Sequence, residues 1–183
     1  MIAVLDTSSL LAFVRYYLPF DKNDTFKNLL KDKFERGEII ILDKVVDEAK
    51  GIAKGIILTE LDFIGKSKKV FNTTELLPTK KFFNLLENQF CDKNIIKLKG
   101  IDDVAFELEK SNYLKSPDAN LIIYAMSINS NNPIIVTEET RSANDNKLFK
   151  KIPTNCLEVD IKCCTLPQLF KEHFKLNLSE LLK

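Results

Sequence analysis

Residues 1–14 read MIAVLDTSSLLAFV, and this stretch predicts a strand, a tight turn and a helix in immediate succession. Ile2 to Leu5 form a short apolar run, whose length suits a strand buried on both faces, as in a parallel sheet. After a polar turn, apolar residues recur at helical spacing over 10–14. The stretch therefore predicts an α/β fold that begins with a buried strand.

Asp6 follows this first strand directly, and two interpretations of it are open. Asp, Thr and Ser all favour helix N-caps, so Asp6 can serve the helix that follows. Ligands of open α/β sheets bind beyond the carboxyl ends of the strands, so Asp6 can also be a metal or phosphoryl ligand. The stretch alone favours the cap, and the remaining acids of the chain favour the ligand.

The composition indicates one globular domain. The chain has 183 residues, of which 45% are hydrophobic and 29% charged, an ordinary globular mixture. No apolar run is long enough to cross a membrane, and no basic segment precedes an apolar one at the N-terminus. We therefore expect a cytoplasmic protein with no membrane partner. The net charge of +1 neither requires nor excludes a nucleic-acid partner.

The four cysteines and the single histidine do not indicate a zinc site. No cysteine pair has the CxxC spacing, and Cys163 is adjacent to Cys164. We expect the cysteines to be buried, reduced thiols. His173 is distant in sequence from the acids discussed below, and we assign it no role.

The remaining segments alternate between strand and helix patterns. Further buried strands are predicted at 39–42, 134–136 and 161–164, with a short edge strand at Val70-Phe71. Ser116-Pro117 is the clearest helix start, because Ser is favoured at the N-cap and Pro at the next position. The pattern predicts a three-layer α/β/α sandwich with a mainly parallel central sheet.

Residues 73–115 have the pattern of two or three helices, and no linker-like composition flanks them. We interpret them as a helical insertion within a single domain that spans residues 1–183. In the last of these helices, the spacing places Val104, Phe106 and Leu108 inward, with Tyr113 as a further candidate.

Four acids fall where a parallel sheet would bring them together. Asp6 follows the first strand, Glu138 or Glu139 follows the strand at 134–136, and Glu48 and Asp118 lie near helix starts. Strand carboxyl ends and the following helix N-termini share one edge of such a sheet. Clustered carboxylates repel one another unless cations balance them. Oxygen ligands of this type select Mg²⁺ or Mn²⁺, and two such ions can promote phosphodiester hydrolysis.

The chain resembles the PIN-domain nucleases, a family that includes the toxins of bacterial and archaeal toxin–antitoxin pairs. Four segments carry the resemblance: LDTSSLL at 5–11, VVDEAKG at 45–51, SPDANLIIYAM at 116–126 and IIVTEET at 134–140. The segment KKIPTNCLEVDIKCC at 150–164 is similar to an uncharacterised PIN-like subgroup with a long helical middle. With the order of strands and helices between the motifs, the resemblance covers most of the chain.

The resemblance implies a divalent-metal-dependent endoribonuclease, and it assigns the ligands. Asp6 would be the first metal ligand, Glu48 the second, Asp118 the third and Glu139 the fourth, a position where the family more often has Asp. The supporting residues would be Thr7, Ser8, Thr137 and Glu138. The implied cofactor is Mg²⁺ or Mn²⁺, and the implied partners are RNA, an antitoxin protein and a second copy of the chain.

Alternatives to each assignment remain open. Asp6 and Asp118 can be helix caps, Glu48 or its neighbour Asp47 can be a solvated helix residue, and Glu139 can be an exposed loop acid. A degenerate PIN-like domain that binds RNA or a protein without cleavage is the main alternative function. A phosphatase of the haloacid dehalogenase type is less favoured, because its second acid would stand at position 8, which is Ser8.

Basic residues lie near the acid motifs in two groups. One group surrounds the irregular segment and comprises Lys50, Lys54, Lys66, Lys68, Lys69, Lys80 and Lys81. The other follows the last motif and comprises Arg141, Lys147, Lys150 and Lys151. Both can be solvated surface, and we favour a phosphate-binding role for the second group. The apolar spacing of Leu178, Leu181 and Leu182 suggests a dimerisation tail.

Overall fold

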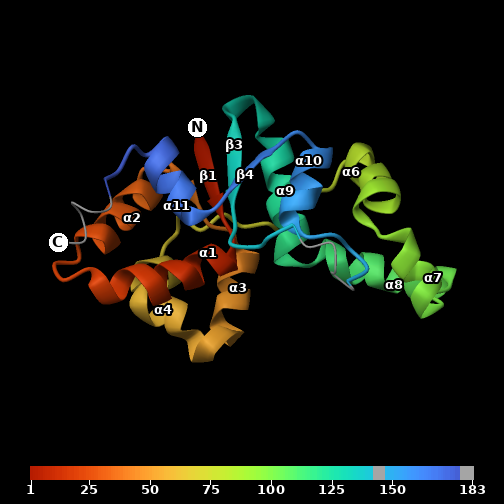
Figure 1. The fold of residues 1–183 in the computed structure, drawn as a ribbon, viewed down its shortest axis with the longest axis horizontal. Coiled ribbons are helices and arrows are strands. Elements are labelled where there is room, and N and C mark those ends of the chain that lie inside the picture. The colour runs from red at the N-terminus through yellow and green to blue at the C-terminus, as the bar shows by residue number, and fades with distance from the viewer. Residues whose placement is uncertain (142–146, 178–183) are drawn as a thin grey trace.

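A parallel four-stranded sheet forms the centre of the molecule (Figure 1). The computed structural model describes residues 1–141 and 147–177. The strands lie in the order β2-β1-β3-β4, with bounds β1 Ile2–Leu5, β2 Ile39–Ile40, β3 Pro133–Val136 and β4 Lys162–Cys164. Because Leu5 pairs with Val136, β1 and β3 end level with each other, and the residues that follow them leave the sheet side by side.

Helices cover the sheet, which confirms the predicted α/β/α architecture (Figure 1). The α-helices are α1 Thr7–Ala12, α2 Thr25–Glu35, α3 Asp43–Gly51, α4 Ile56–Glu60, α5 Asp62–Gly65, α6 Lys80–Leu85, α7 Lys93–Lys99, α8 Asp103–Leu114, α9 Pro117–Ser127, α10 Ile152–Glu158 and α11 Leu166–Gln168. Shorter 3₁₀- or π-helical turns are η1 Phe13–Tyr17, η2 Leu18–Phe20, η3 Ile52–Gly55, η4 Leu86–Phe90, η5 Asn129–Asn131 and η6 Leu169–His173.

The strand predicted at 39–42 is shorter than expected. Only Ile39 and Ile40 pair with β1, because the chain turns into α3 at Asp43. Leu42 instead forms a single bridge with Phe71, so the edge strand predicted at Val70-Phe71 is reduced to that bridge. The outer strand on this side of the sheet is therefore minimal, and α3 begins close to the carboxyl end of β1.

An aromatic cluster fixes the start of the chain against its end. The Phe13 ring lies 5.1 Å from that of Phe26 and 6.3 Å from that of Phe170, and the last two rings are 4.7 Å apart. These rings come from η1, α2 and η6, three elements that are distant in sequence. Tight packing of buried rings leaves little freedom for η1, which continues α1 away from the sheet.

The helices α6, α7 and α8 form one end of the molecule (Figure 1), so the helices expected within 73–115 are present, but they begin only at Lys80 and residues 73–79 are not helical. The prediction that Val104 and Leu108 face inward is wrong, since they are 81% and 63% exposed. Phe106 is half-buried. Tyr113 is buried at the C-terminal end of α8, where its ring stacks on Phe149 at 4.3 Å. Because the C-terminal end of α8 makes the main contact with the core, the first turns of α8 remain open to solvent.

The cysteine prediction is half right. All four thiols are free, and Cys91 and Cys156 are buried. Cys163 and Cys164 are only half-buried, because β4 lies at the edge of the sheet. The tail residues Leu178, Leu181 and Leu182 lie outside the described residues. Within residues 1–141 and 147–177, no helix combines the length and apolar character needed to cross a membrane.

The N-cap of α9 gives a first testable prediction. The Ser116 hydroxyl accepts a hydrogen bond from the amide of Ala119 at 3.2 Å and donates one to the carbonyl of Tyr113 at 2.6 Å. Replacing Ser116 by Ala should lower the free energy of unfolding by about 1 kcal/mol, because the cap is lost. Urea denaturation would measure this change. The Ser116→Thr variant keeps the hydroxyl, and an equal loss in that variant would contradict the capping explanation.

Candidate metal-binding acid cluster

Asp6 lies at the centre of the candidate site and is only 5% exposed. Its Oδ1 accepts a hydrogen bond from the amide of Thr7 at 2.7 Å, so it caps α1 as the first interpretation predicts. Its Oδ2 accepts from the hydroxyls of Ser8 at 2.6 Å and Thr137 at 2.9 Å. The level ends of β1 and β3 explain why Thr137 can reach Asp6. These bonds fix the carboxylate in one orientation.

Glu48 is linked to Asp6 through Thr7, which hydrogen-bonds to both carboxylates. The Thr7 hydroxyl donates a hydrogen bond to Glu48 Oε2, which ties α3 to the start of α1. Its neighbour Asp47 points elsewhere and forms an ion pair with Lys50 at 2.6 Å, with both side chains largely exposed. Of the two acids that the sequence offered at this place, Glu48 is therefore the one that lies in the cluster.

Asp118 stands in the first turn of α9, immediately beyond the Ser116 cap. The pKa of its carboxyl group is raised from 3.8 to about 7, first by burial and then by the negative charges of Asp6, Glu139 and Glu48, and the positive charge of Lys147 opposes the rise. The pKa of a carboxyl group rises in this way when like charges surround it in a poorly hydrated place. Asp6, Glu48 and Glu139 thus all lie within electrostatic reach of Asp118.

The two glutamates that follow β3 have different surroundings. Glu138 Oε1 accepts a hydrogen bond from the amide of Leu166 at 2.7 Å, so this side chain reaches the start of α11. Glu139 Oε2 accepts from the amide of Ile152 at 3.1 Å. Burial and the charge of Asp6 raise the pKa of Glu139. Glu139 is therefore the fourth acid of the cluster, and Glu138 lies beside it.

The donor set suits a hard divalent cation. Asp6, Glu48, Asp118 and Glu139 contribute carboxylate oxygens only, the ligands that Mg²⁺ and Mn²⁺ prefer. A cation at this place would offset the repulsion that raises the pKa of Asp118. In the described part of the chain, no group of three or more acidic, histidine or cysteine side chains is placed so that it could hold a metal ion. Metal binding would therefore require the acidic side chains to move.

Two residues behind Asp118 were not expected from the sequence. Asn155 is fully buried, and its side-chain amide donates to the Tyr113 hydroxyl at 3.1 Å and to the carbonyl of Lys150 at 2.8 Å. Burial raises the pKa of Tyr113, and the charge of Asp118 adds to the rise. Tyr113 appeared in the sequence only as a possible core residue. Nothing in a separation of 42 residues indicates its pairing with Asn155.

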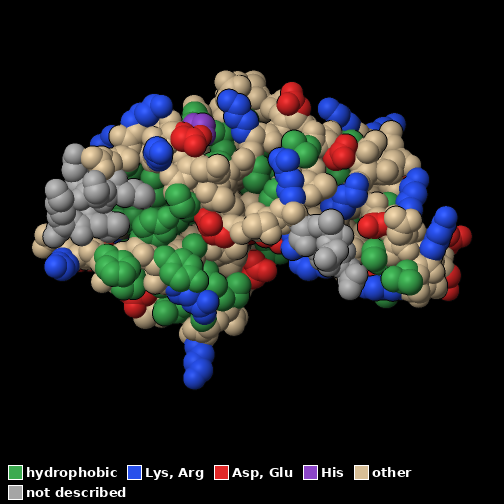
Figure 2. Space-filling model, viewed as in Figure 1, with side chains coloured by type: hydrophobic (Ala, Val, Ile, Leu, Met, Phe, Trp, Pro, Cys, Tyr) green, Lys and Arg blue, Asp and Glu red, His purple; other side chains and the backbone are tan. Residues whose placement is uncertain are grey.

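Two cavities flank the acids. One of about 300 Å³ is bounded by Asp118, Tyr113, Lys99 and Lys147. The other, of about 360 Å³, borders Ser8 and Glu138. Figure 2 shows acidic side chains near the centre of this face, with hydrophobic side chains on one side over α1.

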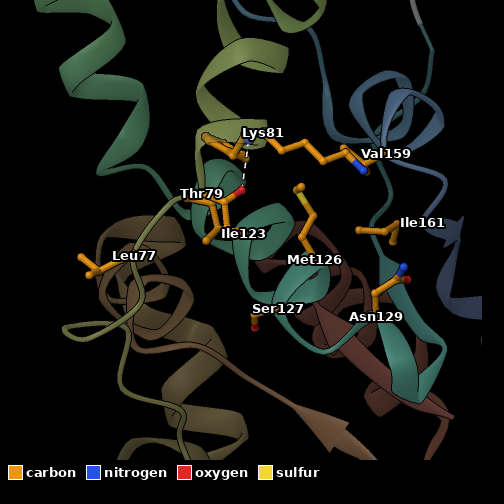
Figure 3. A pocket seen from close by; sticks show the side chains of 10 residues that line it. Leu77, Thr79, Lys81, Ile123, Met126, Ser127, Asn129, Val159 and Ile161 are labelled. Atoms are coloured by element: carbon orange, nitrogen blue, oxygen red, sulfur yellow. Dashed lines mark hydrogen bonds between the residues drawn. The ribbon is translucent and has the colours of Figure 1, made fainter.

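A third cavity of about 330 Å³ lies away from the acids, where β3 and β4 begin. Figure 3 shows the side chains of Ile123, Met126 and Ile161 around it, with Lys81 extending across one side. None of the described residues that line it carries a carboxylate. Lys81 belongs to the first basic group of the sequence. Because it lies at this cavity, it does not lie beside the acid cluster.

Two lysines of the second basic group act electrostatically on the acids. The charge of Lys147 lowers the pKa of both Asp118 and Glu139, and Lys151 has the same effect on Glu139. These positive charges compensate only part of the repulsion, because the pKa of each acid is still raised. His173 ends η6 and contributes nothing to these shifts.

The contact between Thr7 and Glu48 gives a second prediction. Replacing Thr7 by Val keeps the side-chain shape but removes the hydroxyl that orients Glu48. We expect the affinity for Mg²⁺ to fall about 10-fold or more, since groups that orient metal ligands commonly contribute 10- to 100-fold. Calorimetric titration would measure it. The Thr7→Ser variant should stay near wild type, and equal affinities for the Val and wild-type proteins would contradict the role assigned to Thr7.

Comparison with known proteins adds the family. No curated protein and no solved structure matches the chain. Residues 4–175 match a family described as a domain of unknown function, DUF4411, and this span includes all four acids of the cluster. The chain therefore belongs to the DUF4411 family.

Proposed function

We propose that this protein is a divalent-metal-dependent endoribonuclease with a PIN-like fold. The observation that carries the proposal is the raised pKa of Asp118, which arises from burial and from the charges of Asp6, Glu139 and Glu48. Asp6 is buried, Asp118 and Glu139 are half-buried, and Glu48 is exposed. Like charges gathered at such a place are costly to a protein that does not use them. The position of the group beyond the carboxyl ends of β1 and β3 is also where α/β proteins bind ligands.

Asp6, Glu48, Asp118 and Glu139 would hold Mg²⁺ or Mn²⁺. When bound, such ions lower the pKa of a coordinated water and stabilise charge on the leaving oxygen of a phosphodiester. The protein residues have separate tasks. Ser8 and Thr137 fix Asp6, Thr7 fixes Glu48, and the amide of Ile152 fixes Glu139.

Positive charge beside the acids supports an RNA substrate. Lys99 and Lys147 border the cavity next to Asp118. Their positive charges would attract a phosphate of the RNA strand beyond the cleaved bond. Contacts of this kind are largely independent of base sequence. We place the enzyme in the cytoplasm, in keeping with its four free cysteines.

The proposal includes restraint by a protein partner, as in toxin–antitoxin pairs. An antitoxin would block activity by covering the acid cluster and its two flanking cavities. The homodimer expected from the C-terminal tail stays a prediction, because the tail lies outside the described residues.

Cleavage of a 5′-labelled single-stranded RNA tests the proposal. We expect internal cleavage in Mn²⁺ or Mg²⁺ and none in excess EDTA, with activity restored when the metal is returned. A folded protein that binds several RNAs without cutting any of them in either metal would contradict the nuclease. That result would favour the degenerate, binding-only alternative.

A further inference from the structure

A cavity beside the acid cluster is lined by α1, η1 and the residues that follow β3. Its volume is about 360 Å³, and its lining includes Ser8, Arg15, Tyr16, Tyr17 and Glu138. Two of these residues connect it to the cluster. The Ser8 hydroxyl donates to Asp6 Oδ2 at 2.6 Å, and Glu138 directly precedes Glu139. A group bound in this cavity would therefore sit next to the position proposed for the metal.

The aromatic side chains of the cavity are unusually placed. Tyr16 is 67% exposed. Tyr17 is the next residue, and ring contacts to Phe13 at 6.0 Å and Phe170 at 5.8 Å hold it in place. The exposed ring thus projects from a helix that the core keeps rigid. Figure 2 shows hydrophobic side chains gathered on the surface over α1.

The backbone at this point has a conformation that it also has at η4 and η6. Residues Phe13–Tyr17 form a π-helical turn, in which the amide of Leu18 donates to the carbonyl of Phe13. Such turns occur frequently at functional sites, and they change the direction in which side chains leave the helix. Tyr16 is about 12 Å along the helix from Ser8, since a helix rises about 1.5 Å per residue. This separation suits a nucleotide that neighbours the bond to be cut.

Charged groups of both signs complete the cavity. Arg15 is exposed and forms no ion pair with any described residue. Glu138 uses Oε1 to accept the amide of Leu166, and a carboxylate can accept further bonds. A planar ring, a cation and a hydrogen-bond acceptor together match a nucleobase with its phosphate. Exposed aromatic rings stack on unpaired bases, and arginine binds phosphates or stacks on bases.

We propose that this cavity binds one unpaired nucleobase of single-stranded RNA, next to the phosphodiester cut at the acid cluster. The inference rests on the proposed function and adds a substrate class to it. Tyr16 stacks on the base, Arg15 contacts the adjoining phosphate, and Glu138 accepts a hydrogen bond from the base edge. Because Glu138 only accepts, it pairs with a donor on the base edge, such as an exocyclic amino group or the N3–H of uracil, and does not select strongly among the bases. A base paired within a duplex cannot enter.

Fluorescence anisotropy with a labelled, unstructured RNA oligomer tests this site. The parent protein carries Asp118→Asn, so that the oligomer is not cut. Adding Tyr16→Ala should raise the Kd about tenfold, since stacking contributes about 1–3 kcal/mol per base. Tyr16→Phe keeps the ring and should bind like the parent. Phe83→Ala removes another exposed aromatic ring, on α6, and should have no effect.

A scan with single abasic positions makes the test specific. When the abasic position falls at the nucleotide that occupies the cavity, binding to the parent should weaken by the same factor as it does with Tyr16→Ala. The same abasic position should not weaken binding to the Tyr16→Ala variant any further. Equal affinities of Tyr16→Ala and the parent for every oligomer would overturn the inference. If Tyr16→Ala in the wild-type protein, without Asp118→Asn, cleaves RNA with an unchanged KM, the proposed nuclease stands while the base site fails. If the wild type neither binds nor cuts RNA, both proposals fail.

Discussion

The Asp118→Asn variant is expected to lose RNA cleavage by at least about 100-fold while keeping its fold. Asn preserves the shape of the side chain but removes the charge that would bind the metal. Removing one group that stabilises a transition state commonly costs about 10²–10³ in kcat. The negative charges of Asp6, Glu139 and Glu48 all act on Asp118, so removing its charge should affect the whole cluster. Initial rates on a labelled single-stranded RNA would measure the change.

Asp103→Asn provides the matched control. Asp103 is also an acid in the first turn of a helix, but it is exposed on α8. Its replacement should leave the rate unchanged. A second pair separates the two glutamates after β3, since Glu139→Gln should reduce the rate strongly and Glu138→Gln only mildly. Cleavage that survives Asp118→Asn would contradict the assignment of the site.

The same Asp118→Asn substitution should make the metal-free protein more stable at alkaline pH. The folded pKa of about 7 lies above the ordinary value of 3.8, so folding favours the protonated form. The wild type therefore loses stability as the pH rises from about 4 to about 7, and the loss is complete above that range. Each pKa unit corresponds to about 1.4 kcal/mol, so the variant should gain roughly 2–4 kcal/mol at pH 8.

Urea unfolding in EDTA at two pH values measures this effect. At pH 5 Asp118 is mostly protonated in the folded protein, and the gain of the variant should be clearly smaller than at pH 8. Adding Mg²⁺ at pH 8 should stabilise the wild type and not the variant, because a bound cation removes the repulsion. A variant that is less stable than the wild type at pH 8 without metal would show that Asp118 is a structural residue.

The sequence predicts much of this fold because its signals are local. The strand at 2–5, the Asp6 cap and the Ser116-Pro117 helix start each depend on neighbouring residues, and all three are confirmed. The proximity of the four acids could be predicted as well, because parallel strands place their carboxyl ends at one edge.

Features that depend on tertiary packing could not be predicted. The choice between Glu138 and Glu139 is made by the amides of Leu166 and Ile152, which come from distant helices. Val104 and Leu108 follow a helical pattern, but only one end of α8 contacts the core, so both are exposed. The exposure of Tyr16 beside the acids likewise depends on how the core holds η1.

Direct titration with Mn²⁺, followed by the paramagnetic resonance signal of the free ion, tests the central claim most directly. We expect saturable binding to the wild type and to Glu138→Gln. Binding should be lost or greatly weakened in Asp6→Asn, Glu48→Gln, Asp118→Asn and Glu139→Gln. Equal Mn²⁺ binding by the wild type and these four variants, or no binding by the folded wild type, would show that the acid cluster is not a metal site.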